Sequence, residues 1–318
     1  MLTPNVIPFA PMHPEPSEEP AAGPPVDLAA EYETSNVREV IAQIERDLVG
    51  MAPVKAAIQD IAAFLLVDRV RSRLGFAADP PGLHMSFTGR PGTGKTTVAV
   101  QMASILHRLG YVRSGQMVTA NSDDMNGPRV KELVGQALGG VLFIDEAYYL
   151  YKAETDRFSG SSTIEILLQA MENHRHDLVV IVAGYKDRMN RFFEANPGLA
   201  SRVSHHIAFP DYTVPELMGI AHRMLSRQHY RFSAEAEVAF EAGLERAIRL
   251  PYFANARSVR NAIDEARMHQ ANRLFRRRAR AICQQELLTI EADDVYGCAV
   301  FKRDRQIASY PLTTPANS

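Results

Sequence analysis

The sequence predicts an α/β fold in which a helix-covered parallel sheet is followed by a smaller helical unit. Apolar segments of strand length alternate with helical segments from residue 83 to residue 209, an order that is typical of parallel sheets. The capping pattern formed by Thr213 and Glu216 then begins a region that is helical by periodicity to about Phe301. With 46% hydrophobic residues among 318, the chain is long enough to bury both cores.

Two helical stretches precede the alternating region, within residues 36–75. In the first, Val40, Ile44 and Leu48 recur at a spacing that places them on one face of a helix. The expected strands are 83–88, 117–121, 141–146, 178–184 and 205–209, and the helices between them are 94–109, 129–138, 163–174 and 188–195. Because parallel strands end at one edge of a sheet, we expect a ligand at their carboxyl ends.

The terminal segments differ in composition from the rest. The first 33 residues contain eight prolines and six acidic residues but no lysine or arginine, so they lack the basic residues of a signal or transit peptide. Such a segment buries too little apolar surface to offset its ordering entropy. The expected organisation is a disordered tail (1–33), a large α/β domain (34–212), a helical lid domain (213–301) and a flexible tail (302–318).

Composition narrows the class of protein. The formal net charge of −2 provides no general attraction to nucleic acid or to anionic membranes, and no apolar run approaches the roughly 20 residues that span a bilayer. Cys283 and Cys298 are the two cysteines, too few for a disulfide framework or a zinc site. The sequence predicts a protein of the cytoplasm, or of a plastid stroma, without nucleic-acid or membrane partners.

The segment "GRPGTGKTT" follows an expected strand and begins an expected helix, which is the context of a phosphate-binding loop. Its glycines let backbone N–H groups turn toward phosphates, and the helix N-terminus adds a favourable dipole. Lys95 is expected to bind the β- and γ-phosphates of ATP, and the Thr96 hydroxyl to bind Mg²⁺. The candidate nucleotide-binding residues of the loop are Gly89, Pro91, Gly92, Thr93, Gly94, Lys95, Thr96 and Thr97.

The segment "VLFIDEA" supplies two acidic residues to the same edge of the sheet. Four apolar residues bury the strand, and Asp145 and Glu146 follow at its carboxyl end. Asp145 is expected to hold Mg²⁺ through water. Glu146 is expected to orient and polarise the attacking water, a general-base role worth roughly 10²- to 10⁴-fold in rate. The alternative is a pair of acids that only caps the next helix.

Three further side chains are candidates for the ATP reaction. Tyr185 follows the strand 178–184 and is expected either to orient the attacking water or only to pack. Arg202 lies before the last strand, where a planar cation is expected to reach the γ-phosphate of a neighbouring subunit. Arg257 begins a lid helix and is expected to close over the nucleotide, with Arg260 a weaker candidate. Either Arg202 or Arg257 alternatively forms only a surface ion pair.

These motifs together resemble the AAA+ ATPases, and more closely the CbbX (CfxQ) proteins, the red-type Rubisco activases. The resemblance covers residues from about 36 to 280 and includes "LHMSFTGRPGTGKTTVA", "VLFIDEAYYLY", "DLVVIVAGYKDRMNRFFEANPG" and "FANARSVRNAIDEARMHQANRLF". It implies that 89–96 is the Walker A loop, that Asp145 and Glu146 are the Walker B pair, and that Arg202 is the arginine finger. Arg257 would be the sensor 2 residue, and Tyr185 occupies the sensor 1 position.

The resemblance also implies what the protein does. Members of the family are ring-forming ATPases, expected here as a hexamer, that remodel inhibited ribulose bisphosphate carboxylase. They bind ribulose 1,5-bisphosphate as an allosteric ligand and act on the C-terminal segment of the large subunit of the carboxylase, which releases the inhibitory sugar phosphate. An arginine supplied by a neighbouring subunit fits such a ring, because head-to-tail contacts that close are needed to deliver it.

The segment after residue 121 departs from the family pattern. There the family has an aromatic-glycine loop that lines the pore of the ring, whereas here "SDDMNG" runs directly into Pro128 without an aromatic residue. An aromatic side chain grips a threaded chain through its large apolar face, and Met125 is a weaker substitute. The chain is therefore either a full activase that works without the aromatic residue, a supporting subunit of a mixed ring, or a remodeller of another client.

Other classes of protein also contain a phosphate loop. A P-loop kinase does not need adjacent acids together with an edge arginine and a lid arginine. A nucleic-acid motor should present a basic pore face, but the segment 122–140 carries two basic and three acidic residues. A non-motor scaffold would bind ATP and assemble but leave its client unchanged.

Overall fold

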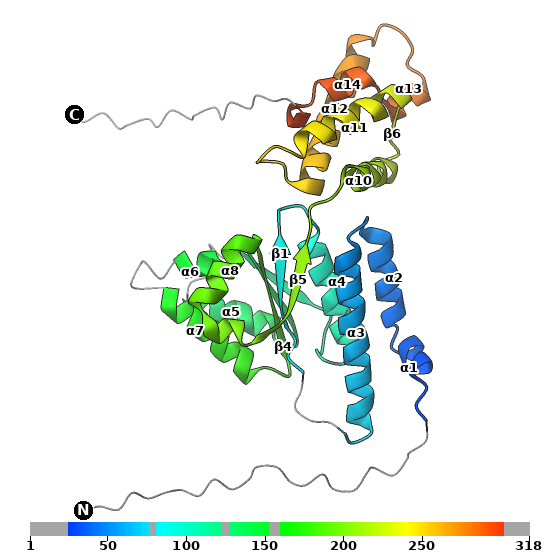
Figure 1. Cartoon of the computed structure of the whole chain (residues 1–318). Coiled ribbons are helices and arrows are strands. Elements are labelled where there is room, and N and C mark those ends of the chain that lie inside the picture. Colours follow the sequence, from blue (N-terminus) through cyan, green and yellow to red (C-terminus); the bar gives the residue numbers. More distant parts are fainter. Residues whose placement is uncertain (1–24, 77–80, 122–126, 153–159, 302–318) are drawn as a thin grey trace, which may run out of the picture.

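The computed structural model describes residues 25–76, 81–121, 127–152 and 160–301 (Figure 1). Residues 1–24 and 302–318, which contain most of the predicted tails, lie outside the described residues, as does Met125. Among the described residues, each helix is either too short or too polar to cross a bilayer.

A five-stranded parallel sheet forms the centre of the larger domain, in the order β2-β3-β4-β1-β5. Its strands are β1 (His84–Gly89), β2 (Met117–Asn121), β3 (Gly140–Asp145), β4 (Leu178–Gly184) and β5 (Val203–Phe209). All seven residues of β4 are buried, which explains why its sequence is a continuous apolar run. The predicted parallel sheet and its strand positions are therefore confirmed.

Helices cover both faces of the sheet. Alternate residues of β3 face opposite ways, with Val141 and Phe143 in one apolar cluster and Leu142 and Ile144 in the other. Figure 1 shows the two helical layers on either side of the sheet. The first layer contains α2 (Val37–Asp47), α3 (Ala52–Arg73) and α4 (Lys95–Arg108), and the second contains α5 (Gly127–Ala137), α7 (Gly160–Asn173) and α8 (Lys186–Ala195), with the short α6 (Tyr149–Lys152) and α9 (Pro197–Ala200) beside it.

The prediction of disorder was wrong for residues 28–33, which belong to helix α1 (Leu28–Thr34). The Asp27 carboxylate caps this helix by accepting hydrogen bonds from the backbone N–H groups of residues 29 and 30, at 2.9 and 3.1 Å. Glu31 forms an ion pair with Arg73 of α3, and Tyr32 packs against the core. Composition alone missed the helix because these stabilising contacts come from distant residues.

The smaller domain follows the linker 210–213 and is mainly helical, as predicted. Its core contains Phe240, Leu244, Val259 and Ile263. The predicted short strand and closing helix near its end are β7 (Thr289–Ile290) and α14 (Ala292–Tyr296), and β7 pairs in parallel with an unexpected strand, β6 (Arg231–Phe232). The other elements are α10 (Val214–Arg227), α11 (Ala234–Ala247), α12 (Asn255–Arg276), α13 (Gln284–Leu288) and η2 (Ala299–Phe301).

The predicted capping box begins α10 at the domain junction. The Thr213 hydroxyl accepts a hydrogen bond from the Glu216 backbone N–H at 3.4 Å, and the Glu216 carboxylate accepts one from the Thr213 N–H at 2.8 Å. Each bond satisfies a donor that the first turn of a helix leaves without an intrahelical partner.

Replacing Thr213 with alanine is expected to lower the free energy of unfolding by about 1 kcal/mol, because one donor of the first turn loses its acceptor. Chemical denaturation followed by circular dichroism measures this change. Ser226→Ala is the matched control, since Ser226 is exposed on the same helix and should change stability by less than about 0.5 kcal/mol. Equal effects of the two substitutions would contradict the capping role.

Candidate nucleotide site

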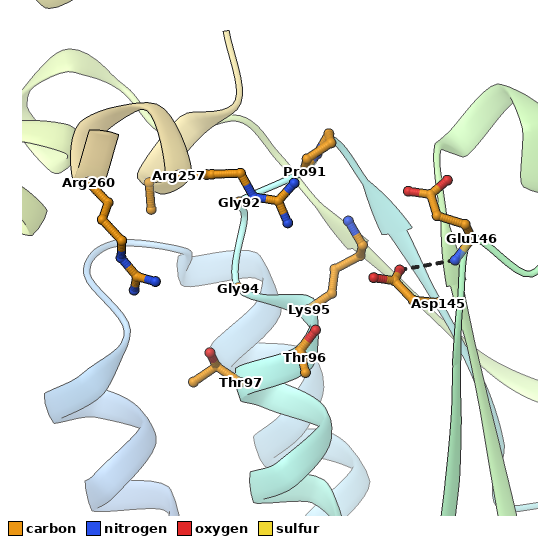
Figure 2. Close-up of a pocket in the computed structure, with 11 residues that line it drawn as sticks. Pro91, Gly92, Gly94, Lys95, Thr96, Thr97, Asp145, Glu146, Arg257 and Arg260 are labelled. Atoms are coloured by element: carbon orange, nitrogen blue, oxygen red, sulfur yellow. Dashed lines mark hydrogen bonds between the residues drawn. The ribbon is translucent and has the colours of Figure 1, made fainter. Parts of the chain in front are cut away.

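A cavity of about 450 Å³ lies where the phosphate loop, the end of β3 and the start of α12 meet (Figure 2). It is at the carboxyl edge of the sheet, where a ligand was predicted. Most of the predicted site residues come together here. The lining residues are Pro91, Gly92, Gly94, Lys95, Thr96, Thr97, Asp145, Glu146, Ala256, Arg257 and Arg260.

The phosphate loop connects β1 to α4 and depends on two glycines. Gly92 and Gly94 have φ values of 74° and 99°, a region that residues with a side chain rarely adopt. A Cβ atom on Gly92 would lie 2.2 Å from the carbonyl oxygen of Ala254 in the lid domain. Thr93 is fully buried, and its hydroxyl donates a hydrogen bond to the Arg90 carbonyl at 2.8 Å. Gly92 is thus required both by the loop conformation and by the close approach of the lid.

Lys95 lies at the start of α4 and is almost fully buried. Its ammonium group donates hydrogen bonds to the carbonyl oxygens of Gly89 and Arg90, at 2.9 and 3.0 Å. Burial lowers the pKa of Lys95, while the nearby Asp145 and Glu146 oppose that shift. The lysine is held at the phosphate loop by neutral acceptors, which phosphate oxygens can replace with a stronger charge-assisted interaction.

Asp145 ends β3 and Glu146 follows it, next to this lysine. The Glu146 backbone N–H donates a hydrogen bond to the Asp145 carboxylate at 3.1 Å, and Glu146 has a φ of 52° (Figure 2). Burial raises the pKa of Glu146, and the adjacent Asp145 raises it further. The Oε2 atom of Glu146 is buried and has no hydrogen-bond partner among the described residues. A buried acceptor without a partner indicates a position for a donor such as water.

These residues fit ATP with Mg²⁺. The Thr96 hydroxyl and the Asp145 carboxylate both face the cavity, and both are oxygen ligands of the kind that Mg²⁺ prefers. Within the described part of the chain, no three histidine, cysteine or acidic side chains gather as a metal site. The Thr96 hydroxyl and the Asp145 carboxylate suit an ion that is held mainly by phosphates and water, as Mg²⁺ commonly is.

Tyr185 lies beside the cavity rather than in its lining. It follows β4 and precedes α8, and its ring centre is 6.4 Å from that of Tyr148. The Arg188 guanidinium lies over both rings, at 5.3 Å from Tyr185 and 5.0 Å from Tyr148. Burial raises the pKa of Tyr185, and the negative charge of Glu146 adds to the shift. Tyr185 therefore packs against Tyr148 and Arg188, and its role in orienting the attacking water stays a prediction.

The two candidate arginines lie in different places. Arg257 projects from the first turn of α12 toward the phosphate loop, and its charge influences Lys95 and Glu146 (Figure 2). Arg202 is absent from the cavity lining. It precedes β5, whose first residue pairs with His84 at the amino end of β1, so Arg202 lies at the opposite edge of the sheet. Any contact of Arg202 with nucleotide has to involve another subunit.

Local contacts hold Arg202 in the structure. Its guanidinium donates a hydrogen bond to the Gly198 carbonyl at 3.0 Å and forms an ion pair with Glu172 at 3.2 Å. The surface ion pair that was weighed as an alternative is therefore present. With its side chain 35% exposed, Arg202 is partly accessible from outside, as a residue that reaches a neighbour must be.

Sequence reasoning missed a group of polar residues behind the phosphate loop. Arg90, Asp211, Tyr212 and Asn255 are linked there by hydrogen bonds between the loop, the linker and the lid. Arg90 lies inside the loop motif at a position that the motif leaves free. Asn255 is the first residue of α12, two positions before Arg257, and this position was the available signal.

Comparison with known proteins places the chain in a family. A model of the ATPase family associated with various cellular activities (AAA) matches residues 85–211, and an AAA lid domain model matches residues 213–306. The chain is 54% identical to a CfxQ homolog of Pyropia yezoensis, over 87% of this chain and 94% of that protein. It is 53% identical to the CbbX protein of Cereibacter sphaeroides, over 87% and 92%. The chain belongs to the CbbX/CfxQ family of AAA ATPases.

A third relative, with a similar sequence identity, is named for its activity. The chloroplastic ribulose bisphosphate carboxylase/oxygenase activase of Cyanidioschyzon merolae is 51% identical, over 87% of this chain and 97% of that protein. Among solved structures, a mutant of RuvB from Thermotoga maritima matches with a TM-score of 0.53 and 20% identity, over 79% and 70% of the two chains. That likeness confirms the fold. As an AAA ATPase, this CbbX/CfxQ protein binds ATP with Mg²⁺ and hydrolyses ATP.

Gly92→Ala is expected to weaken ATP binding at least tenfold and to lower the free energy of unfolding by roughly 1–3 kcal/mol, because the new methyl group requires a strained φ and displaces the lid. Nucleotide titration and chemical denaturation measure the two effects. Gly135→Ala is the control, since no described atom beyond the backbone of its own helix lies within 4 Å of the added Cβ and stability should rise by about 0.5 kcal/mol. Normal ATP binding by the Gly92 variant would show that this close approach is unimportant.

Proposed function

We propose that this protein is an ATP-driven remodelling chaperone that reactivates inhibited red-type ribulose bisphosphate carboxylase. The observation that carries the proposal is the complete phosphate-loop and acidic-pair site in a chain that is 51% identical to a named activase over 97% of that protein. The client is the large subunit of the carboxylase, and the product of the remodelling is carboxylase freed of its bound sugar phosphate. The protein works where this carboxylase works, in the cytoplasm or in a plastid stroma.

Some of the cavity residues bind the phosphates and the metal ion, and Glu146 takes part in proton transfer during hydrolysis. Lys95 and the N–H groups of the phosphate loop hold the β- and γ-phosphates. Thr96 would hold Mg²⁺ directly and Asp145 would hold it through water, and the ion would neutralise phosphate charge. Glu146 orients the attacking water and accepts its proton, a role that is supported by its buried Oε2 atom, which has no hydrogen-bond partner in the described part of the chain. Tyr185 helps to hold that water.

Two arginines complete the site, Arg257 from the lid domain and Arg202 from a neighbouring subunit. Arg257 contacts the nucleotide from the lid, where it already influences Lys95 and Glu146. Arg202 acts as an arginine finger on the γ-phosphate of the next subunit, which its place at the opposite edge of the sheet supports. Because each subunit offers its finger to one neighbour, the subunits assemble head to tail into a closed ring, a hexamer in this proposal. Ribulose 1,5-bisphosphate is the proposed allosteric ligand.

A second function is favoured by one observation. The segment that follows β2 reads "SDDMNG" and has no aromatic residue to grip a threaded chain. The alternative is therefore a supporting ATPase subunit in a ring mixed with a related subunit, or a remodeller of another client.

The ATPase activity is expected to fall as the pH decreases through the pKa of Glu146, which is raised. Only the deprotonated Glu146 accepts a proton, and burial together with Asp145 raises its pKa, so it is protonated at a higher pH than an ordinary glutamate of pKa about 4.3. The pH profile of kcat/KM at saturating Mg²⁺ measures this acidic limb. Glu146→Gln is the control and should lose both the limb and most of the activity. A limb that persists in that variant would assign the titration to another group.

Reactivation of carboxylase inhibited by ribulose bisphosphate tests the proposed function directly. This protein alone is added with Mg-ATP, and carboxylase activity and phosphate release are followed in the same sample. Return of activity with ATP consumption is expected. Arg202→Ala should lose about 10³- to 10⁵-fold in hydrolysis, as removal of an arginine finger does, and reactivation with it.

The other outcomes of this assay have distinct meanings. Hydrolysis by the unmodified protein without reactivation would overturn the autonomous activase in favour of a supporting subunit or another client. Near-normal turnover by the Arg202→Ala variant would show that a different residue is the finger.

A further inference from the structure

A polar junction fastens the lid domain to the phosphate loop outside the cavity. We use this name for Arg90 of the loop, Asp211 and Tyr212 of the linker, and Asn255 at the start of α12. The four residues come from three segments that are far apart in the sequence, and they form one connected set of hydrogen bonds. The cavity lining includes none of them, so the junction has a role other than direct contact with nucleotide.

Asn255 is the centre of the junction. It is fully buried, and its side-chain amide donates to the Asp211 carboxylate at 2.8 Å and to the Pro91 carbonyl at 3.3 Å. Its side-chain oxygen accepts a hydrogen bond from the Tyr212 backbone N–H at 3.0 Å. Only an amide side chain presents two donors and an acceptor on neighbouring atoms in this way. Asn255 thus contacts the phosphate loop and the linker at once.

Arg90 makes a second connection between the same parts. Its guanidinium forms an ion pair with the other oxygen of Asp211 at 3.2 Å. It also donates to the carbonyl oxygens of Phe253 and Pro251, at 2.9 and 3.3 Å, in the loop that leads to α12. The Asp211 carboxylate is therefore shared, with one oxygen on Asn255 and the other on Arg90, and the phosphate loop is joined to the lid at two points.

The backbone at Asn255 is strained and points α12 at the cavity. Asn255 has a φ of 49°, a left-handed conformation that asparagine tolerates better than most residues with a side chain. The next residue, Ala256, donates its N–H to the Gly92 carbonyl at 3.2 Å. Arg257 follows directly, and its side chain lines the cavity. The position of Arg257 is thus fixed by the contacts of the two residues before it.

We propose that Asn255 is a positioning residue for ATP hydrolysis: it anchors the first turn of α12 to the phosphate loop and so holds Arg257 on the nucleotide. The inference rests on the proposed function for the role of Arg257. Its basis is that the strained backbone and the three buried hydrogen bonds of Asn255 converge on the turn that carries this arginine. Strain of this kind persists only where surrounding contacts determine it.

The test uses the full chain with Asn255→Ala and Asn255→Gly. Both remove the side-chain bonds, but glycine adopts the left-handed conformation without strain, so Asn255→Gly should be the more stable of the two. Each variant is expected to lose about 10- to 100-fold in kcat/KM for ATP, because small misplacement of a group that contacts the reacting phosphate is costly. Asn261→Ala, at an exposed asparagine on the same helix, is the control and should match the unmodified protein.

A merely structural role would give a different result. It would lower the unfolding temperature of Asn255→Ala and leave kcat/KM unchanged below that temperature. Equal loss of kcat/KM in the alanine and glycine variants, despite their different stabilities, is therefore the expected signature of positioning. Normal kcat/KM for a folded Asn255→Gly variant would overturn the proposal.

A double-variant cycle separates this inference from the proposed function. If Asn255 acts through Arg257, the glycine substitution should change kcat/KM by less than about threefold in an Arg257→Ala background, because residues that act as one unit are not additive. A full additional loss would overturn the inference while leaving the role of Arg257 intact. If Arg257→Ala alone leaves kcat/KM unchanged, the proposed role of Arg257 fails, and the positioning of Arg257 fails with it.

Discussion

The parallel register of the central sheet is the constraint on which the nucleotide site depends. Strands β1 and β3 both pair with β4, so the residues that follow them arrive at one edge. That edge brings Lys95, which follows β1, close to Asp145 and Glu146 at the end of β3. Burial of β4 along its whole length fixes the register, because a slip of one residue would exchange the two buried faces. Packing on both faces therefore determines the chemistry at the edge.

Basic and acidic side chains both line the cavity that this edge creates. Three basic and two acidic side chains line it, so the acids do not cancel the attraction for a triphosphate. Burial acts in opposite directions on the two kinds of group: it lowers the pKa of Lys95 and raises that of Glu146. The two shifts have the same origin, the removal of water from a site in which each charge is partly compensated by the other.

Much of the fold and of the cavity could be predicted from the sequence because both depend on local patterns. Apolar runs identified the five strands, and the loop motif identified most of the lining residues. Helix α1 could not be predicted from composition, since Tyr32 and Glu31 are stabilised by residues of the core and of α3. Asn255 was missed because a buried asparagine has no periodic signal, and its partners lie 43 to 164 positions away.

The sequence by itself determined the parallel α/β architecture, the helical lid and the motifs of the phosphate loop and of the acidic pair. Hydrophobic periodicity, glycine placement and motif spacing are properties of short segments, so a single chain displays them. Only the tertiary structure decided that Arg257 faces the cavity and that Arg202 lies at the opposite edge of the sheet. It also joined the lid to the phosphate loop through Asn255 and Arg90. These relations depend on contacts between segments that are far apart in the sequence. The order of the residues does not show which of those segments meet.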